Sequence, residues 1–134
     1  MRILLDTGPL VALLNRRDAL HARSIEQAGR LKPPFYSCEA VLTEAHFLLA
    51  GIPGGRDRLI ELVSSDRINL SFSYASNRKR VDELMLQYRN VPISFADACL
   101  VCLAEQHACS IFTLDGDFRI YRKHRNEPLD VIMP

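Results

Sequence analysis

The stretch Ser94–Phe118, SFADACLVCLAEQHACSIFTLDGDF, decides the fold of this chain. Its residues 98–104 are apolar on every side, which is the pattern of a buried helix. Residues 110–113 then predict a short buried strand. One aspartate, Asp97, opens the helix, and two more aspartates follow the strand. The stretch therefore combines a buried helix, a buried strand and acidic residues next to both.

The two later aspartates, Asp115 and Asp117, follow the carboxyl end of the predicted strand. In open α/β sheets, ligand sites form where strand ends meet helix N-termini. Asp97 has a second interpretation, because an aspartate at a helix start also complements the helix dipole. From this residue alone, ligand and helix cap are evenly balanced.

Length and composition predict a single globular domain over residues 1–134. The chain is 48% hydrophobic and 25% charged, as in ordinary soluble domains. The opening run is apolar only as far as Leu14 and contains Asp6, so it is too short for a membrane span or a signal peptide. We therefore expect a cytoplasmic protein without membrane contact. The net charge of +1 indicates no whole-molecule attraction to nucleic acid.

Strand and helix patterns alternate along the chain. Strands are predicted over 3–5, 35–38, 68–72, 110–113 and 129–132. Helices are predicted over 9–14, 18–29 with Asp18 as its cap, 39–50, 59–63, 74–88, 97–106 and 116–124. This alternation predicts an α/β fold, a three-layer α/β/α sandwich with a central parallel sheet of four to five strands. Right-handed crossovers then place the functional strand ends along one edge.

Two short motifs resemble ligand sites but are interpreted as structural. Cys99 and Cys102 have the C-x-x-C spacing, but no second pair stands at zinc-finger spacing, and both lie inside the apolar helix. We expect them to pack in the core. The glycine-rich residues 51–55 lack the Lys-Ser/Thr ending of a phosphate-binding loop and are read as a turn.

Acidic residues stand beside apolar runs in four separate segments. They are Asp6, Glu44, Asp97, and Asp115 with Asp117. Burying an unpaired carboxylate is costly, and these segments contain no Lys or Arg to pair with them. A divalent cation is the remaining partner, and oxygen ligands favour Mg²⁺ or Mn²⁺ over zinc. Such a site activates water and neutralises the charge of a phosphodiester.

Together these segments resemble the PIN-domain ribonucleases, and most closely the VapC-like toxins of toxin–antitoxin pairs. The matching segments are ILLDTGPLVALLNRRDALH at 3–21, TEAHFLL at 43–49, SFADACLVCLAEQHA at 94–108 and IFTLDGDF at 111–118. The resemblance spans nearly the whole chain, and it is the combination of the four segments that makes it specific.

The resemblance implies an Mg²⁺- or Mn²⁺-dependent endoribonuclease, a homodimer, and a small antitoxin that masks the RNA groove. The positions that match the acidic metal and catalytic site are Asp6, Glu44, Asp97 and Asp115. The positions that match its supporting residues are Asp117, Thr7, Ser94 and Thr113.

A basic run near the C-terminus is the candidate RNA contact. It contains Arg119, Arg122, Lys123 and Arg125, with Tyr121 and His124 between them. Lys and Arg that neutralise phosphates dominate nucleic-acid binding. The same run also fits a solvated helix face, and the sequence does not decide between the two.

Three alternatives remain open at this point. The chain fits an RNA-processing or decay PIN nuclease without an antitoxin, a small phosphatase or phosphoacceptor regulator using Asp6, or a non-catalytic binding module. The phosphatase class expects a second aspartate two residues after Asp6, where Gly8 stands. The full set of acidic residues argues against the binding module. His46, beside Glu44, is interpreted as structural, and neither it nor Cys99 identifies an RNA target.

Overall fold

The computed structural model describes residues 1–134 and contains a five-stranded parallel sheet with the strand order β3-β2-β1-β4-β7. Its strands are β1 (Arg2–Leu5), β2 (Phe35–Tyr36), β3 (Ile68–Asn69), β4 (Cys109–Phe112) and β7 (Asp130–Ile132). The helices are α1 (Thr7–Leu14), α2 (His21–Gly29), α3 (Glu39–Leu49), α4 (Gly55–Ser64), α5 (Tyr74–Gln87) and α6 (Phe95–Gln106). A 3-10 helix (Gly116–Arg119) and an antiparallel hairpin of β5 (Arg122–Lys123) and β6 (Glu127–Pro128) lie between β4 and β7.

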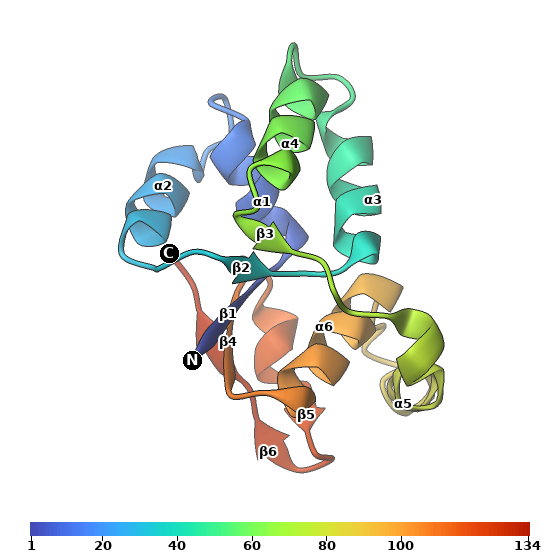
Figure 1. Ribbon diagram of the computed structural model, residues 1–134. Helices are drawn as coiled ribbons and strands as arrows, with labels where there is room; N and C mark the ends of the chain where they lie inside the picture. Colours follow the sequence, from blue (N-terminus) through green and yellow to red (C-terminus); the bar gives the residue numbers. More distant parts are fainter.

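The helices cover the sheet as two separate layers. The connections through α1–α2 and α3–α4 step the chain in one direction across the sheet, from β1 to β2 to β3. The connection through α5 and α6 returns it to the other side of β1. Right-handed crossovers therefore put α1 to α4 on one face and α5 and α6 on the other. Figure 1 shows the first group in the upper part of the molecule and α6 to the right of β1 and β4. The predicted three-layer α/β/α fold is confirmed.

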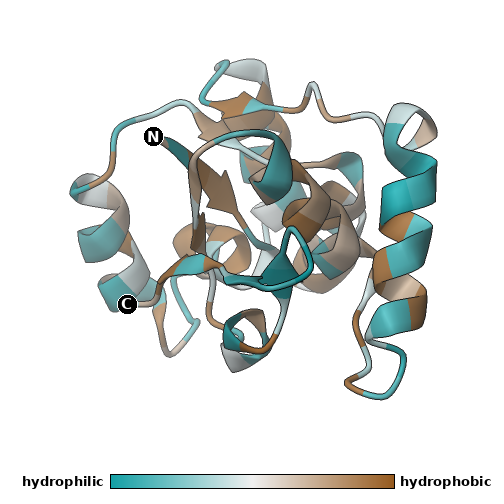
Figure 2. Cartoon of the chain, turned by 90° about the horizontal axis from the view of Figure 1, so that it is seen from below, coloured by the Kyte–Doolittle hydropathy of each residue, from teal (hydrophilic) through white to brown (hydrophobic).

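Helix α6 is the most deeply buried helix. Its residues 96–104 are all buried, because the helix packs against β4, α5, α3 and the β5 strand at once. The run of small and aliphatic side chains with no polar face is the sequence cause of this position. Ser94 begins the helix as its N-cap, with its hydroxyl accepting a hydrogen bond from the backbone N–H of Asp97 at 3.0 Å. Viewed from below, hydrophobic segments gather in the middle of the molecule, and the outlying helices carry hydrophilic residues (Figure 2).

The helix predicted over 116–124 is wrong. Only Gly116–Arg119 forms a 3-10 turn, and the chain then enters the β5–β6 hairpin. Phe118 and Tyr121 are both fully buried, and a spacing of three brings them to one side of a 3-10-like turn. The hairpin reverses at His124 and Arg125, whose φ angles of 48° and 72° are incompatible with a right-handed helix.

The amino-terminal helices start differently from the sequence prediction. Helix α1 begins at Thr7 with Asp6 as its N-cap, two residues before Pro9, which was expected to be its first residue. Helix α2 begins at His21 and not at Asp18, whose carboxylate instead accepts from the backbone N–H of Leu20 at 2.9 Å in the preceding turn. None of the helices is long and apolar enough to cross a membrane.

Shortening a core side chain of α6 should destabilise the fold strongly. Leu100 has 0% exposure, so Leu100→Ala should lower the free energy of unfolding by about 2–5 kcal/mol through lost burial and a residual cavity. The control is Leu86→Ala on α5, where the side chain is 65% exposed and the loss should stay within about 0.5 kcal/mol. Chemical denaturation of both variants measures the difference, and similar losses would contradict the central position of α6.

Candidate functional site

The site is organised by Asp6, at the carboxyl end of β1. Leu5 of β1 pairs with Phe112 of β4, so the residues that follow these two strands lie side by side. One carboxylate oxygen of Asp6 accepts from the backbone N–H of Thr7 at 2.8 Å. The other accepts from the hydroxyl of Thr113 at 2.7 Å. Asp6 is only 6% exposed, so these two donors hold a nearly buried carboxylate in a fixed orientation.

Thr113 also links Asp6 to the loop that follows β4. Its hydroxyl oxygen accepts from the backbone N–H of Asp115 at 2.9 Å while its proton goes to Asp6. The carboxylate of Asp115 in turn accepts from the backbone N–H of Asp117 at 2.9 Å and caps the 3-10 helix. One hydroxyl group thus fixes the spacing between the carboxylates that follow β1 and β4.

Glu44 and Asp97 reach the same place from two helices. The carboxylate of Glu44, on α3, accepts from the Thr7 hydroxyl at 2.9 Å. The backbone of Asp97 is held by the Ser94 cap, and its carboxylate accepts from the phenol of Tyr121 at 3.1 Å. Asp97 is not the cap of α6, because Ser94 holds that position; it stands in the first turn of the helix and lines the acidic cleft.

The five carboxylates line one cleft of about 440 Å³. Its lining residues are Asp6, Thr7, Gly8, Glu44, Leu48, Pro92, Ser94, Asp97, Leu114, Asp115 and Asp117. None of the salt bridges in the structure involves any of these carboxylates. The cleft thus collects acidic side chains whose only partners are hydroxyl and backbone N–H groups.

Burial and mutual repulsion make ionisation costly in this cleft. Burial raises the pKa of Asp6 to about 6; the charges of Asp97 and Glu44 reinforce the shift, and the bonds from Thr113 and Thr7 oppose it. Burial also raises the pKa of Asp97, against the hydrogen bonds from Ser94 and Tyr121 and together with the charge of Asp115. No three acidic, His or Cys side chains in the structure are grouped closely enough to hold a metal ion.

Two groups of predicted residues differ in their placement. The structure brings Asp6, Glu44, Asp97, Asp115, Asp117, Thr7 and Ser94 to the cleft, with Thr113 directly behind it. It places Arg119, Arg122 and Lys123 outside the cleft, on the 3-10 helix and the hairpin. The Arg122 guanidinium is occupied by backbone carbonyl groups of residues 119–121. Among the three, Arg122 is therefore the least available for RNA.

Sequence reasoning missed the role of Tyr121. It stands inside the basic run, where it was read only as a residue between charges, yet its fully buried phenol contacts Asp97. Burial, with the adjacent charge of Asp97, raises the pKa of Tyr121, so the phenol keeps its proton and acts as a donor. No short pattern indicates this contact, since the two residues are 24 positions apart.

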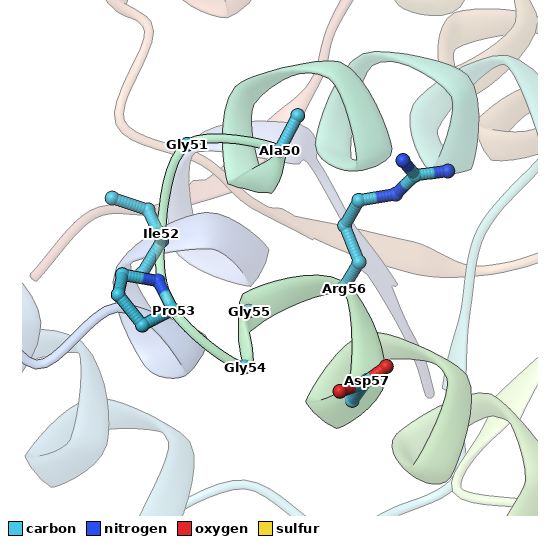
Figure 3. A pocket seen from close by; sticks show the side chains of 8 residues that line it. All are labelled: Ala50, Gly51, Ile52, Pro53, Gly54, Gly55, Arg56 and Asp57. Atoms are coloured by element: carbon cyan, nitrogen blue, oxygen red, sulfur yellow. The ribbon is translucent and has the colours of Figure 1, made fainter.

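The remaining candidate features are structural. All four cysteines are buried and free, as expected for core packing. The glycine-rich residues 51–55 form the turn between α3 and α4, where Gly54 has a φ of 70°. Figure 3 shows the hollow beside this turn, with Arg56 and Asp57 pointing in different directions. It shares no residue with the acidic cleft.

The fold and site define an α/β protein with a carboxylate cleft at the carboxyl edge of a parallel sheet. The chain belongs to the PIN-domain family, whose family model matches residues 3–124. The resemblance drawn from the sequence motifs is confirmed at this level.

Solved structures share the fold over almost the whole chain. One is VapC20 of Mycobacterium tuberculosis, described as a sarcin–ricin loop cleaving toxin, with a TM-score of 0.75 and 22% identity over 86% of this chain and 91% of that one. Another is VapBC2 of Rickettsia felis, solved bound to a DNA fragment from their promoter, with a TM-score of 0.67 and 16% identity over 99% and 98% of the two chains. A search of curated proteins gave no match.

The raised pKa of Asp6 predicts a pH-dependent loss of stability without metal. The folded chain holds this proton more tightly than the unfolded chain, so the penalty is absent below about pH 4 and complete above about pH 6. Asp6→Asn should remove the penalty and be more stable than the parent at neutral pH. The gain in the free energy of unfolding should be limited to about 1 kcal/mol, because the amide keeps only some of the hydrogen bonds that the carboxylate accepts.

Denaturation in EDTA at several pH values measures this difference. The matched control is Asp57→Asn, an exposed aspartate of α4 outside the cleft, whose difference from the parent should not change over the same pH range. A parent that is more stable than Asp6→Asn at neutral pH and equally stable near pH 4 would reverse the expected sign.

Proposed function

We propose that this protein is an Mg²⁺- or Mn²⁺-dependent endoribonuclease that hydrolyses RNA phosphodiester bonds, and that it is the toxin of a type II toxin–antitoxin pair. The observation that carries the proposal is the cleft itself. Carboxylates from four separate segments face one another there without a cationic side chain. Membership of the PIN-domain family supports the same activity.

The donor set fits a hard divalent cation. Asp6, Glu44, Asp97 and Asp115 offer only carboxylate oxygens, and the cleft is lined by no His or Cys. When bound, such a cation supplies Lewis-acid chemistry, polarising a phosphodiester and acidifying water. A bound cation would also offset the burial and the mutual repulsion that together raise the pKa values of Asp6 and Asp97.

The chain's own residues do the positioning. Thr113 and the backbone of Thr7 fix both oxygens of Asp6, and the Thr7 hydroxyl holds Glu44. These short bonds to charged acceptors use some of the carboxylate lone pairs and leave the others available to a cation. The reacting phosphate would therefore meet carboxylates whose orientation is set before it arrives, which lowers the cost of reaching the transition state.

The phosphatase alternative is opposed by the space around Gly8. A Cβ atom at this position would lie 3.2 Å from the Cβ of Leu114 and 3.3 Å from two further atoms of the same side chain. A second aspartate two residues after Asp6 would therefore need Leu114 to move. The cleft supports a phosphodiester hydrolase better than a phosphatase that uses such an aspartate pair.

Partners are proposed from the family and from exposed apolar surface. Phe47 is 81% exposed and Leu48 52% exposed on α3. Consecutive exposed apolar side chains of this size favour a protein contact, which we assign to a homodimer. An antitoxin that masks the RNA groove is expected from the resemblance to VapC-like toxins, and the similarity to VapBC2 is consistent with it.

Cleavage of RNA should depend on both a divalent cation and Asp97. The parent should cleave labelled RNA with Mn²⁺ and lose the activity in EDTA. Asp97→Asn should lower the rate at matched Mn²⁺ by at least about 100-fold, or about 2.7 kcal/mol of barrier, because a carboxylate of the cleft is lost. Asp57→Asn, outside the cleft, should cleave like the parent.

The same assay includes a generic phosphomonoester, which separates the alternatives. Turnover of the phosphomonoester without RNA cleavage would favour the phosphatase, and no turnover of either substrate would favour a binding module. Full activity of Asp97→Asn would show that the Asp97 carboxylate is not needed for cleavage. Growth arrest on expression, relieved by the product of a neighbouring gene, separates the toxin from a processing nuclease.

RNA binding should depend on the exposed charges of the hairpin region. We expect Arg119→Ala with Lys123→Ala to weaken binding and to reduce the slope of log affinity against log salt by about 1–2. Each phosphate contact that is lost means that fewer counterions are released when RNA binds. Arg122 is left intact because its guanidinium holds the local backbone. The control, Arg23→Ala with Lys32→Ala, removes the same charge from exposed positions on and after α2. Equal salt slopes for the two double variants would indicate that the basic run is a solvated surface and not an RNA contact.

A further inference from the structure

A buried tyrosine holds one carboxylate of the cleft from behind. Tyr121 has 0% exposure and does not line the cleft, yet its hydroxyl donates to one carboxylate oxygen of Asp97 at 3.1 Å. The Ser94 hydroxyl holds the backbone N–H of Asp97, and the Tyr121 phenol is the hydrogen-bond donor to its carboxylate from outside α6.

The ring of Tyr121 is fixed on two sides. It meets Tyr88 edge-on with ring centroids 5.2 Å apart and Phe118 edge-on with centroids 5.4 Å apart. Its backbone N–H donates to the carbonyl of Asp117 at 3.2 Å, in the turn that carries the last acidic residue of the cleft. A fully buried ring with these contacts has one available position, so the direction of its hydroxyl is fixed as well.

The next residue is tied to the same aromatic group. The backbone N–H of Arg122 donates to the phenol oxygen of Tyr88 at 2.9 Å. Tyr88 ends α5 and makes no hydrogen bond to a cleft carboxylate, whereas Tyr121 does. The two tyrosines thus share one cluster and one chemistry but differ in what their hydroxyl groups contact.

We propose that Tyr121 is a positioning residue for the acidic site: its phenol occupies one oxygen of Asp97 and leaves the other for a cation that the cleft would hold. The inference rests on the proposed function, since it assigns Asp97 to a metal. A hydrogen bond from a neighbouring group fixes the orientation of a carboxylate ligand, and loss of such a partner typically costs 10- to 100-fold in metal affinity or activity.

The test compares Tyr121→Phe with Tyr88→Phe in the full chain. Each change removes one hydroxyl group and keeps the aromatic ring. Calorimetry with Mn²⁺ alone should show affinity about 10- to 100-fold weaker for Tyr121→Phe and within about twofold of the parent for Tyr88→Phe. Cleavage by Tyr121→Phe should recover as Mn²⁺ is raised, and melting curves check that both variants fold. A merely structural role would lower both melting temperatures and leave Mn²⁺ affinity unchanged.

A double variant and a spectrum of the parent complete the test. In an Asp97→Asn background, adding Tyr121→Phe should weaken Mn²⁺ binding no further, because the shared contact is already gone. In the parent, Mn²⁺ should change the near-ultraviolet absorbance of tyrosine, and the change should persist in Tyr88→Phe. Unchanged Mn²⁺ affinity in Tyr121→Phe, or a parent spectrum without a tyrosine change, overturns the inference.

The outcomes also separate this inference from the proposed function. A parent that binds Mn²⁺ and loses affinity in Tyr121→Phe, but cleaves no RNA, supports the role of Tyr121 and overturns the nuclease. A parent that cleaves RNA and shows equal Mn²⁺ affinity in all three proteins keeps the nuclease and overturns the role of Tyr121. A parent that binds no Mn²⁺ overturns the positioning role directly.

Discussion

Keeping several carboxylates close together without a cationic side chain is the constraint on which this structure depends. Asp6 is almost completely buried, so its charge must be met by donors that the fold itself provides. Those donors are the Thr113 hydroxyl and the backbone N–H of Thr7. Hydroxyl and N–H groups lower the cost of the charge without neutralising it. The cleft therefore keeps a negative potential, which a salt bridge to Lys or Arg would have removed.

The parallel sheet is what makes these donors available. The pairing of Leu5 with Phe112 aligns the ends of β1 and β4, and this alignment brings Thr113 to Asp6. Asp97 comes to the same edge because α6 starts there, and nine consecutive residues of α6 are buried. The acidic site thus lies at the start of the most deeply buried helix of the chain. Stability given up among the carboxylates is offset by burial elsewhere in α6, a division common to functional sites.

The sequence carries the parts of this arrangement that depend on local pattern. An apolar run that ends in an aspartate predicts both a strand and a carboxylate at its end, which is why Asp6 and Asp115 could be placed near each other. The helix predicted after Asp115 failed because a spacing of three between Phe118 and Tyr121 suits an α-helix and a 3-10 turn alike. The hairpin then reverses at His124 and Arg125, which have positive φ angles although neither is a glycine, so the sequence did not predict the reversal at these positions.

Contacts between segments that are distant in the sequence could not be predicted from local patterns. The bond from Tyr121 to Asp97 joins a tyrosine in a basic run to an aspartate in the first turn of α6, and no local pattern relates the two positions. The outward position of Leu48 is a similar case, because helical spacing says which side chains share a face but not whether anything covers that face. Both required the tertiary structure.

Hydrogen bonds connect the hairpin region to the cleft. The chain leaves the cleft at Asp117, turns so that Tyr121 returns to Asp97, and continues with an Arg122 N–H bound to Tyr88. Arg119 and Lys123 stand two residues before and two residues after Tyr121. Any phosphate contact that these side chains make therefore acts on the segment that orients Asp97. Binding energy from a contact far from the scissile bond could then help to hold the Asp97 carboxylate in one orientation. Such a contact raises the rate only when it is stronger in the transition state than in the bound substrate. The basic run lies outside the cleft, but Tyr121 within this run is hydrogen-bonded to Asp97, a residue that lines the cleft.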